Sequence, residues 1–191
     1  IAEPQVPPCE EWSTMEKLAK EKEVVGIYIS GHPLDDYKFE MKYFCNAKLE
    51  SLKNLEQHLG KNLSFGGIVT NVQHRTAKNG KGWATFVLEG YDESYEFRIF
   101  DEEYLKYRHF LLQNQFVYFK INVKEGWVNR ETGKKSDPRI QFLDAKMLAD
   151  VLPTFAKKLF IHLDIKDLHS NFVTELNELF AANTGDNSVT F

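Results

Sequence analysis

The chain has 191 residues, of which 42% are hydrophobic, and its formal net charge is −4. This length and apolar content suffice for one medium domain with appendages or for two small domains, and they exclude disorder as the main state. Cys9 and Cys45 have no further ligands at a zinc-binding spacing, so we expect no metal and a reducing, cytoplasmic setting. No apolar run approaches the roughly 20 residues that cross a bilayer, and we expect no membrane contact.

The N-terminal part, residues 1–60, should form a linker followed by a helical segment. Prolines near the start favour an extended linker. Ser13 and Glu16 have the spacing of a capping box at the start of a helix over 14–29. A second short helix is predicted over 34–43. A partly helical connector is then indicated by Leu49, Leu52, Leu55 and Leu59.

The stretch YISGHPLDDY, residues 28–37, has two interpretations. Its histidine and its two carboxylates, His32, Asp35 and Asp36, are ordinary metal ligands. Equally, Pro33 fixes the backbone beside His32, and an acid in the first turn of the next helix meets unpaired backbone donors. We favour architecture, in which this stretch determines how the N-terminal helices pack on the rest of the chain.

Residues 61–150 show the alternation that is typical of strands. Their order is three strands, a short helix and two strands, which suits a five-stranded Greek-key barrel, the OB-fold. The fold class is therefore α+β and mainly β, with another small α+β sheet domain as the alternative. Such barrels usually bind oligonucleotides or oligosaccharides. The predicted elements are strands at 62–76, two strands within 82–100, a helix within 101–113, and strands within 116–128 and 139–148.

Residues 151–191 should form a small, partial α/β element after the barrel. A strand is predicted over 158–165, and an amphipathic helix is predicted within 168–182. The closing residues, 183–191, have the character of a turn that opens a further strand. The chain starts at Ile1 and stops at Phe191 without an obvious start or finish, so we expect it to be a piece of a larger protein.

Three stretches resemble a known family. EWSTMEKLAKEKEVVGIYISGHPLDDY is similar to the segment that precedes the OB-fold in the alpha subunit of bacterial DNA polymerase III. FGGIVTNVQHRTAKNGKGWATFVLEGYDESYEFRIF is similar to the first three strands of that OB-fold. LFIHLDI and TGDNSVTF resemble the start of the C-terminal domain, which joins the clamp loader. The most specific part is the run from Ser30 to Pro33.

The resemblance implies the partners and the division of the chain. Residues 1–60 would be a linker and helical segment, 61–150 the nucleic-acid-binding OB-fold, and 151–191 the start of the C-terminal domain. The expected partners are single-stranded DNA, the remainder of the alpha subunit and the clamp-loader tau subunit. The sliding clamp is a further candidate partner, although QVPPCEEW does not match the family's clamp-binding peptide. The polymerase parts of the family lie upstream of this sequence.

Charge separates along the chain. Residues 61–146 carry 14 Lys and Arg against 11 Asp and Glu, or +3, which leaves −7 for the remainder. Two basic loops should flank one face of an OB-fold barrel. Seven acids lie between Glu89 and Glu103, and this region should avoid phosphate. The first basic loop carries Arg75, Lys78 and Lys81, and the second basic loop carries Arg130, Lys134, Lys135 and Arg139.

Aromatic residues would supply base stacking. Trp83, Phe97, Phe119 and Trp127 are candidates, and Trp127 is the best because it opens a polar loop. Strand aromatics more often fill the barrel, and this is the favoured role of Phe65, Phe86, Phe97 and Phe142. The predicted nucleic-acid-binding residues are Arg75, Lys78, Lys81, Trp83, Trp127, Arg130, Lys134, Lys135 and Arg139.

Catalysis by this stretch finds no support in the sequence. It has no glycine-rich phosphate loop, nucleophile elbow or pair of acids for two metals, and we expect no catalytic residue and no cofactor. We predict a noncatalytic C-terminal fragment of a DNA-directed DNA polymerase, with a barrel that contacts single-stranded template. The main alternative is a replisome interaction module with little DNA affinity. An OB domain of a tRNA synthetase or a helicase is a more distant one.

Overall fold

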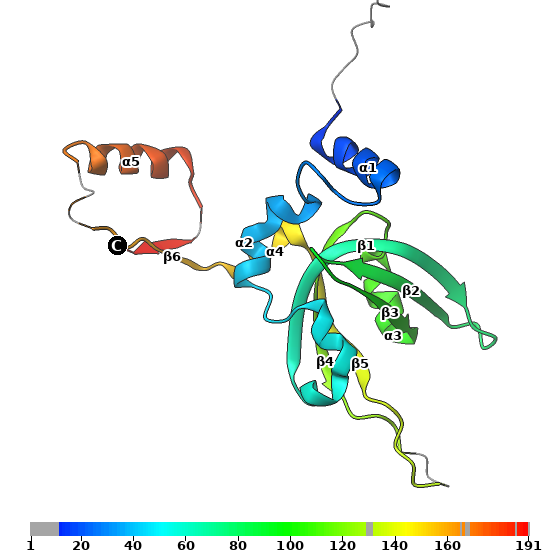
Figure 1. The fold of residues 1–191 in the computed structure, drawn as a ribbon. Coiled ribbons are helices and arrows are strands. Elements are labelled where there is room, and N and C mark those ends of the chain that lie inside the picture. Colours follow the sequence, from blue (N-terminus) through cyan, green and yellow to red (C-terminus); the bar gives the residue numbers. More distant parts are fainter. Residues whose placement is uncertain (1–11, 129–131, 165, 167–168, 186, 191) are drawn as a thin grey trace, which may run out of the picture.

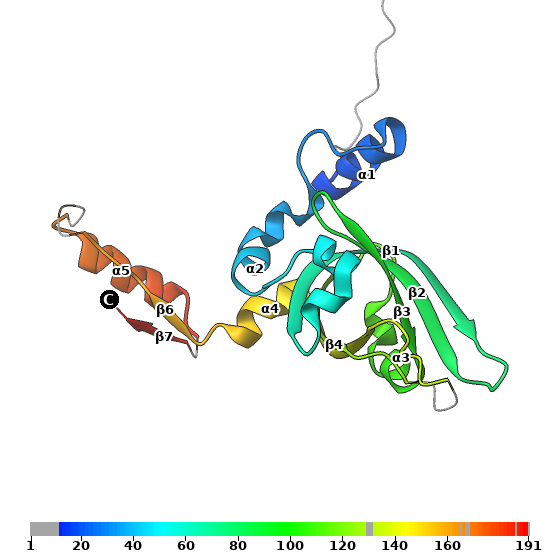
Figure 2. The same ribbon diagram turned by 60° about the horizontal axis from the view of Figure 1, so that its bottom comes forward.

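A computed structural model describes residues 12–128, 132–164, 166, 169–185 and 187–190. Its centre is a curved antiparallel sheet, with short helices at one side and a separate small element beyond them (Figures 1 and 2). Arg130, one of the predicted binding residues, lies outside the described residues, as does most of the QVPPCEEW stretch. In the described part of the chain, no helix is long and apolar enough to cross a bilayer.

Four short helical elements precede the sheet. The capping box predicted for Ser13 and Glu16 is present at the start of α1 (Thr14–Val25). This helix ends before the expected Ile29, because Gly26 takes a left-handed conformation with φ of 86° that closes the last turn. The predicted second helix is split between a 3₁₀ turn and a short α-helix. The 3₁₀ turn is η1 (Pro33–Tyr37), and the α-helix is α2 (Lys38–Tyr43). The leucine-rich connector forms a further 3₁₀ element, η2 (Leu49–His58).

The stretch around His32 is a turn that holds the N-terminal segment on the barrel. The backbone N–H of Leu34 donates to Nδ1 of His32 at 3.1 Å, and the N–H of His32 donates to the Asp35 carboxylate at 3.0 Å. The His32 ring lies 4.6 Å from the ring of Tyr91, in the turn at residues 90–93, and 5.0 Å from that of Tyr28. Of the two acids in this stretch, Asp35 is the one that caps the next helical turn, as the architectural interpretation expected of an acid there.

The sheet has the strand order β3-β2-β1-β4-β5, and every neighbouring pair in it is antiparallel. The first half of β1 pairs with β4 and its second half pairs with β2, so this long strand belongs to both halves of the barrel. An irregularity between Thr70 and Gln73 increases the bend there. The elements are β1 (Asn62–Thr76), β2 (Gly82–Glu89), β3 (Ser94–Phe100), α3 (Asp101–Tyr107), η3 (Arg108–Phe110), β4 (Phe116–Lys124) and β5 (Arg139–Met147).

The predicted OB-fold barrel is confirmed by this sheet and by its core. The ring of Phe97 on β3 lies 5.7 Å from that of Phe142 on β5, although these strands are at opposite ends of the strand order. The sheet therefore curls until its two ends share one apolar interior. Phe65 and Phe86 are also buried in it, as expected. Phe119 is fully buried too, so it is not available as a stacking platform.

Helix α4 (Leu148–Phe155) was missed by the sequence analysis, which extended the last strand to Leu148. The helix contains Pro153 near its end. Its Leu148 and Val151 are buried with Leu34 of η1 in a second core outside the barrel. Because α4 packs against α2, β4 and β5, it joins the N-terminal helices to the sheet.

The C-terminal element lies apart from the barrel in both views (Figures 1 and 2). Strand β6 (Lys158–Phe160) pairs in parallel with β7 (Ser188–Thr190), and α5 (Phe172–Ala182) connects them along the chain. The closing segment does open a strand, as predicted. The strand β6 is much shorter than the predicted 158–165, and within the described range this element contributes no residue to either core.

Candidate nucleic-acid interface

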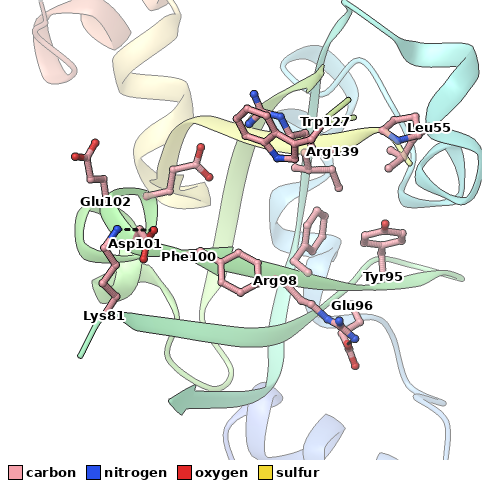
Figure 3. A pocket seen from close by; sticks show the side chains of 14 residues that line it. Leu55, Lys81, Tyr95, Glu96, Arg98, Phe100, Asp101, Glu102, Trp127 and Arg139 are labelled. Atoms are coloured by element: carbon pink, nitrogen blue, oxygen red, sulfur yellow. Dashed lines mark hydrogen bonds and ion pairs between the residues drawn. The ribbon is translucent and has the colours of Figure 1, made fainter. Parts of the chain in front are cut away.

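A groove of about 940 Å³ opens beside β3, between that strand and the loop that joins β4 to β5 (Figure 3). In the described part of the chain, no ladder joins β3 to β5, so the barrel is open along this line. The groove collects three of the predicted residues, Lys81, Trp127 and Arg139, from the two predicted loops. The interior side chains Tyr95, Phe97 and Ile140 form part of its lining.

Trp127 is the most accessible of the predicted stacking residues. Its side chain is 71% exposed, and the Arg139 guanidinium lies 4.4 Å from the ring centroid. The backbone around it is nevertheless held, since the Trp127 N–H donates to Ser136 Oγ at 2.8 Å and the Ser136 N–H donates to the Trp127 carbonyl at 2.9 Å. Gly126 permits this close approach, because a Cβ there would lie 1.9 Å from the Ser136 carbonyl oxygen.

Three side chains form a second stack on the outer face of β1, β2 and β3. The Arg75 guanidinium lies 5.4 Å from the Trp83 ring, and the Trp83 ring stacks on Phe100 at 5.6 Å with an interplanar angle of 19°. Arg75 and Trp83 are directly paired on neighbouring strands. Arg75, which we had assigned to the first basic loop, therefore lies at the end of strand β1. Phe100 is 51% exposed and also lines the groove.

Phe100 is the residue that sequence reasoning missed. It follows Glu96 and Arg98 on the solvent side of β3, and this alternation was the signal available. An aromatic residue that continues an exposed polar alternation is not barrel filling. Phe100 lines the groove that also contains Trp127 (Figure 3), and its ring stacks on that of Trp83.

The predicted lysines are exposed and only partly engaged. Lys81 forms an ion pair with Asp101 at 2.9 Å, and Lys135 forms one with Glu125 at 3.0 Å. Lys78, in the β1–β2 turn, and Lys134 are exposed and form no ion pair with the described residues. Neither of these two lines the groove.

Four acids of the region that we expected to avoid phosphate line the groove. Glu96, Asp101, Glu102 and Glu103 line it beside Lys81, Arg98 and Arg139. Burial raises the pKa of Glu103, whose carboxylate accepts the Phe142 N–H at 3.4 Å and so covers part of the free edge of β5. Negative charge inside the groove disfavours phosphate there.

Comparison with known proteins identifies relatives for part of the chain. No family model matches it. It is 30% identical to the DNA polymerase III subunit alpha of Saccharopolyspora erythraea over 123 residues, which are 63% of this chain and 10% of that protein. It is 35% identical to the subunit of the same name from Borreliella burgdorferi over 108 residues, covering 56% of the chain and 9% of that protein. The resemblance to the DNA polymerase III alpha subunit is confirmed.

The Campylobacter jejuni DNA polymerase III subunit alpha is a further relative, with 37% identity over 98 residues, or 50% of the chain and 8% of that protein. The matched part thus spans about a tenth of the length of these relatives. Among solved structures, the chain is similar to RecG bound to a three-way DNA junction, with a TM-score of 0.30 and 14% identity over 95% of this chain and 24% of that one.

Proposed function

We propose that the chain is a noncatalytic OB-fold part of a replicative DNA polymerase III alpha subunit and that its barrel contacts single-stranded template DNA. The similarity to alpha subunits supports the setting, and the OB-fold supports the class of ligand. DNA-directed DNA polymerase activity, a nucleotidyl transfer, would belong to other parts of such a subunit. The division at residues 60 and 150 remains part of this proposal.

The observation that supports this function most is the pair of arginine–tryptophan contacts beside one groove. Arg75 with Trp83 and Arg139 with Trp127 each place a guanidinium over an indole ring. Single strands bind through such combinations, because each base stacked on an aromatic ring contributes about 1–3 kcal/mol and arginine adds positive charge. Trp127, at 71% exposure, has an open surface to offer to a base.

The charges indicate how a strand would lie. The four acids of the groove repel phosphate, so the bases should face the groove and its aromatic side chains. The phosphates should instead lie toward the two loops, where Lys78 and Lys134 are exposed. This arrangement separates stacking, in the groove, from phosphate contacts, on the two loops. Little sequence preference is expected from it.

The remaining partners are proposed on the relationship to alpha subunits. The rest of such a subunit would adjoin this part in a cytoplasmic replisome, and the C-terminal element would contribute to binding of the clamp-loader tau subunit. Sliding-clamp binding stays a weaker proposal, since QVPPCEEW does not match the expected peptide.

One observation favours the alternative function, a replisome interaction module with little DNA affinity. The groove carries four acids against three basic residues, and Lys81 and Arg98 are already paired with Asp101 and Glu96. Such a surface suits a protein partner better than an unscreened polyanion. The two functions differ in the salt dependence of DNA binding and in the role of Trp127.

Fluorescence anisotropy with labelled oligonucleotides of several lengths, at several salt concentrations, tests the choice. We expect weak binding that prefers single strands to duplex and falls as salt rises. Trp127→Ala should weaken it with an unchanged salt slope, because stacking releases no counterions. Trp12→Ala, a change of another exposed tryptophan far along the chain from the groove, is the matched control. A flat salt response, or equal affinity for duplex, would favour the interaction module.

A further inference from the structure

A second cavity, of about 490 Å³, lies where the N-terminal helices meet the barrel. It is bounded by α2, by the connector before η2, by the start of β1 and by the turn between β2 and β3. It shares no lining residue with the groove beside β3. A ligand in it would therefore be independent of the proposed DNA contact.

The floor of this cavity is apolar. Leu49 and Phe65 belong to the barrel core, while Met41 and Cys45 pack on the second core, so the cavity marks the seam between the two. Helix α2 approaches β1 closely at this point, since a Cβ on Gly66 would lie 2.5 Å from Met41 Sδ. The cavity is therefore closed at its floor, where α2 contacts β1, and open to solvent at its mouth. A single large apolar side chain could enter such a space and cover its floor.

Lysines surround the opening. Lys38, Lys42 and Lys48 line it from α2 and the connector, and all three side chains are exposed. Lys38 is paired with Asp35 at 3.1 Å, whereas Lys42 and Lys48 form no ion pair within the described ranges. Lys42 lies only over the Tyr43 ring, 5.1 Å from its centroid. Two cations are therefore available to an incoming anion.

The acids of the cavity come from the β2–β3 turn. Glu93 accepts the Leu49 N–H at 3.1 Å, and this bond holds the connector against the turn. Asp92 is exposed on the same turn. A ligand with negative charge should consequently lie toward α2 and the connector, with its apolar part over Met41 and Phe65.

We propose that this cavity binds an acidic peptide segment of another protein, which inserts one large apolar side chain and places its carboxylates beside Lys42 and Lys48. A DNA strand offers phosphates, but its bases carry polar edge atoms that the apolar floor would leave without hydrogen-bond partners. A peptide supplies several carboxylates at the spacing of neighbouring residues together with an anchor. The seam between the two cores then serves as a docking point for a partner.

Fluorescence anisotropy of the whole chain with a labelled peptide, Glu-Asp-Asp-Asp-Leu-Phe, tests the proposal. We expect saturable binding that weakens at least tenfold when the peptide's Phe is replaced by Ser, and again when its Asp residues are replaced by Asn. Lys42→Glu with Lys48→Glu should reduce the affinity at least tenfold. Lys53→Glu with Lys61→Glu, which line neither cavity, should leave it unchanged and control for net charge.

Two further experiments distinguish a peptide in this cavity from other ligands. Ala47→Met, which adds bulk to the cavity wall, should weaken the binding of the Phe peptide, with an unchanged thermal midpoint as the check that the variant folds. An excess of single-stranded oligonucleotide should not displace the peptide. Displacement by the oligonucleotide, equal affinity for decanoate, or no binding at millimolar peptide would each overturn the proposal. Loss of DNA binding in Trp127→Ala would leave it standing.

Discussion

At the residue scale, His32 shows how one side chain links local geometry to stability. Its Nδ1 accepts the N–H of Leu34, a residue that is itself fully buried. Replacement of His32 with Ala should lower the free energy of unfolding by about 1–3 kcal/mol, because it leaves a buried donor unpaired. Chemical denaturation measures this. DNA binding by the folded variant should be unchanged, and stoichiometric metal bound through His32 would contradict the architectural role.

The same histidine should make stability depend on pH. Burial lowers the pKa of His32 below its ordinary value of 6.5, and nearby Lys22 acts in the same direction, while Asp35, Glu89 and Asp92 oppose it. As pH falls, the unfolded chain therefore takes up this proton before the folded one does. Stability should decline as pH falls from about 6.5 through the folded pKa. His32→Ala should lack this part of the decline in denaturation curves taken between about pH 5.5 and 8.

Phe86 and Phe100 separate packing from ligand binding, because they are the same residue type on neighbouring strands. Phe86 is fully buried, so Phe86→Ala should cost roughly 3–5 kcal/mol of unfolding free energy. Phe100 is 51% exposed, so Phe100→Ala should cost much less and should weaken single-strand binding because the stack on Trp83 is removed. Denaturation and anisotropy on both variants test this. Wild-type DNA affinity in Phe100→Ala would remove the residue from the interface.

At the element scale, the two loops should act on DNA and not on the fold. Lys78→Ala with Lys81→Ala removes one exposed ion pair, so the free energy of unfolding should change by only about 0.5 kcal/mol. Single-strand affinity should fall, and the salt slope should decrease by about 0.7 for each phosphate that the variant no longer neutralises. Lys134→Ala with Lys135→Ala should behave alike. If either pair alters stability and leaves DNA affinity unchanged, the loops are structural.

At the scale of the whole molecule, α4 joins the parts that form one packed body. It buries Leu148 and Val151 beside Leu34, and its Phe155 ring lies 5.6 Å from that of Tyr118. The cores of the described residues include nothing after Val151. A chain that ends at Ala156 should therefore keep the thermal midpoint of the barrel. A lower midpoint, seen by calorimetry, would show that the C-terminal element supports the barrel.

The sequence by itself determined the element order, because strand alternation, the capping box at Ser13 and the turn at His32 depend on neighbours along the chain. It also indicated the OB-fold and the relationship to the alpha subunit. Helix α4 was missed because the burial of Leu148 and Val151 depends on η1 and β4, which are distant in sequence. The sharing of one groove by Trp127, Phe100 and four acids was decided only by the tertiary structure, because the curl of the sheet brings β3 beside the β4–β5 loop.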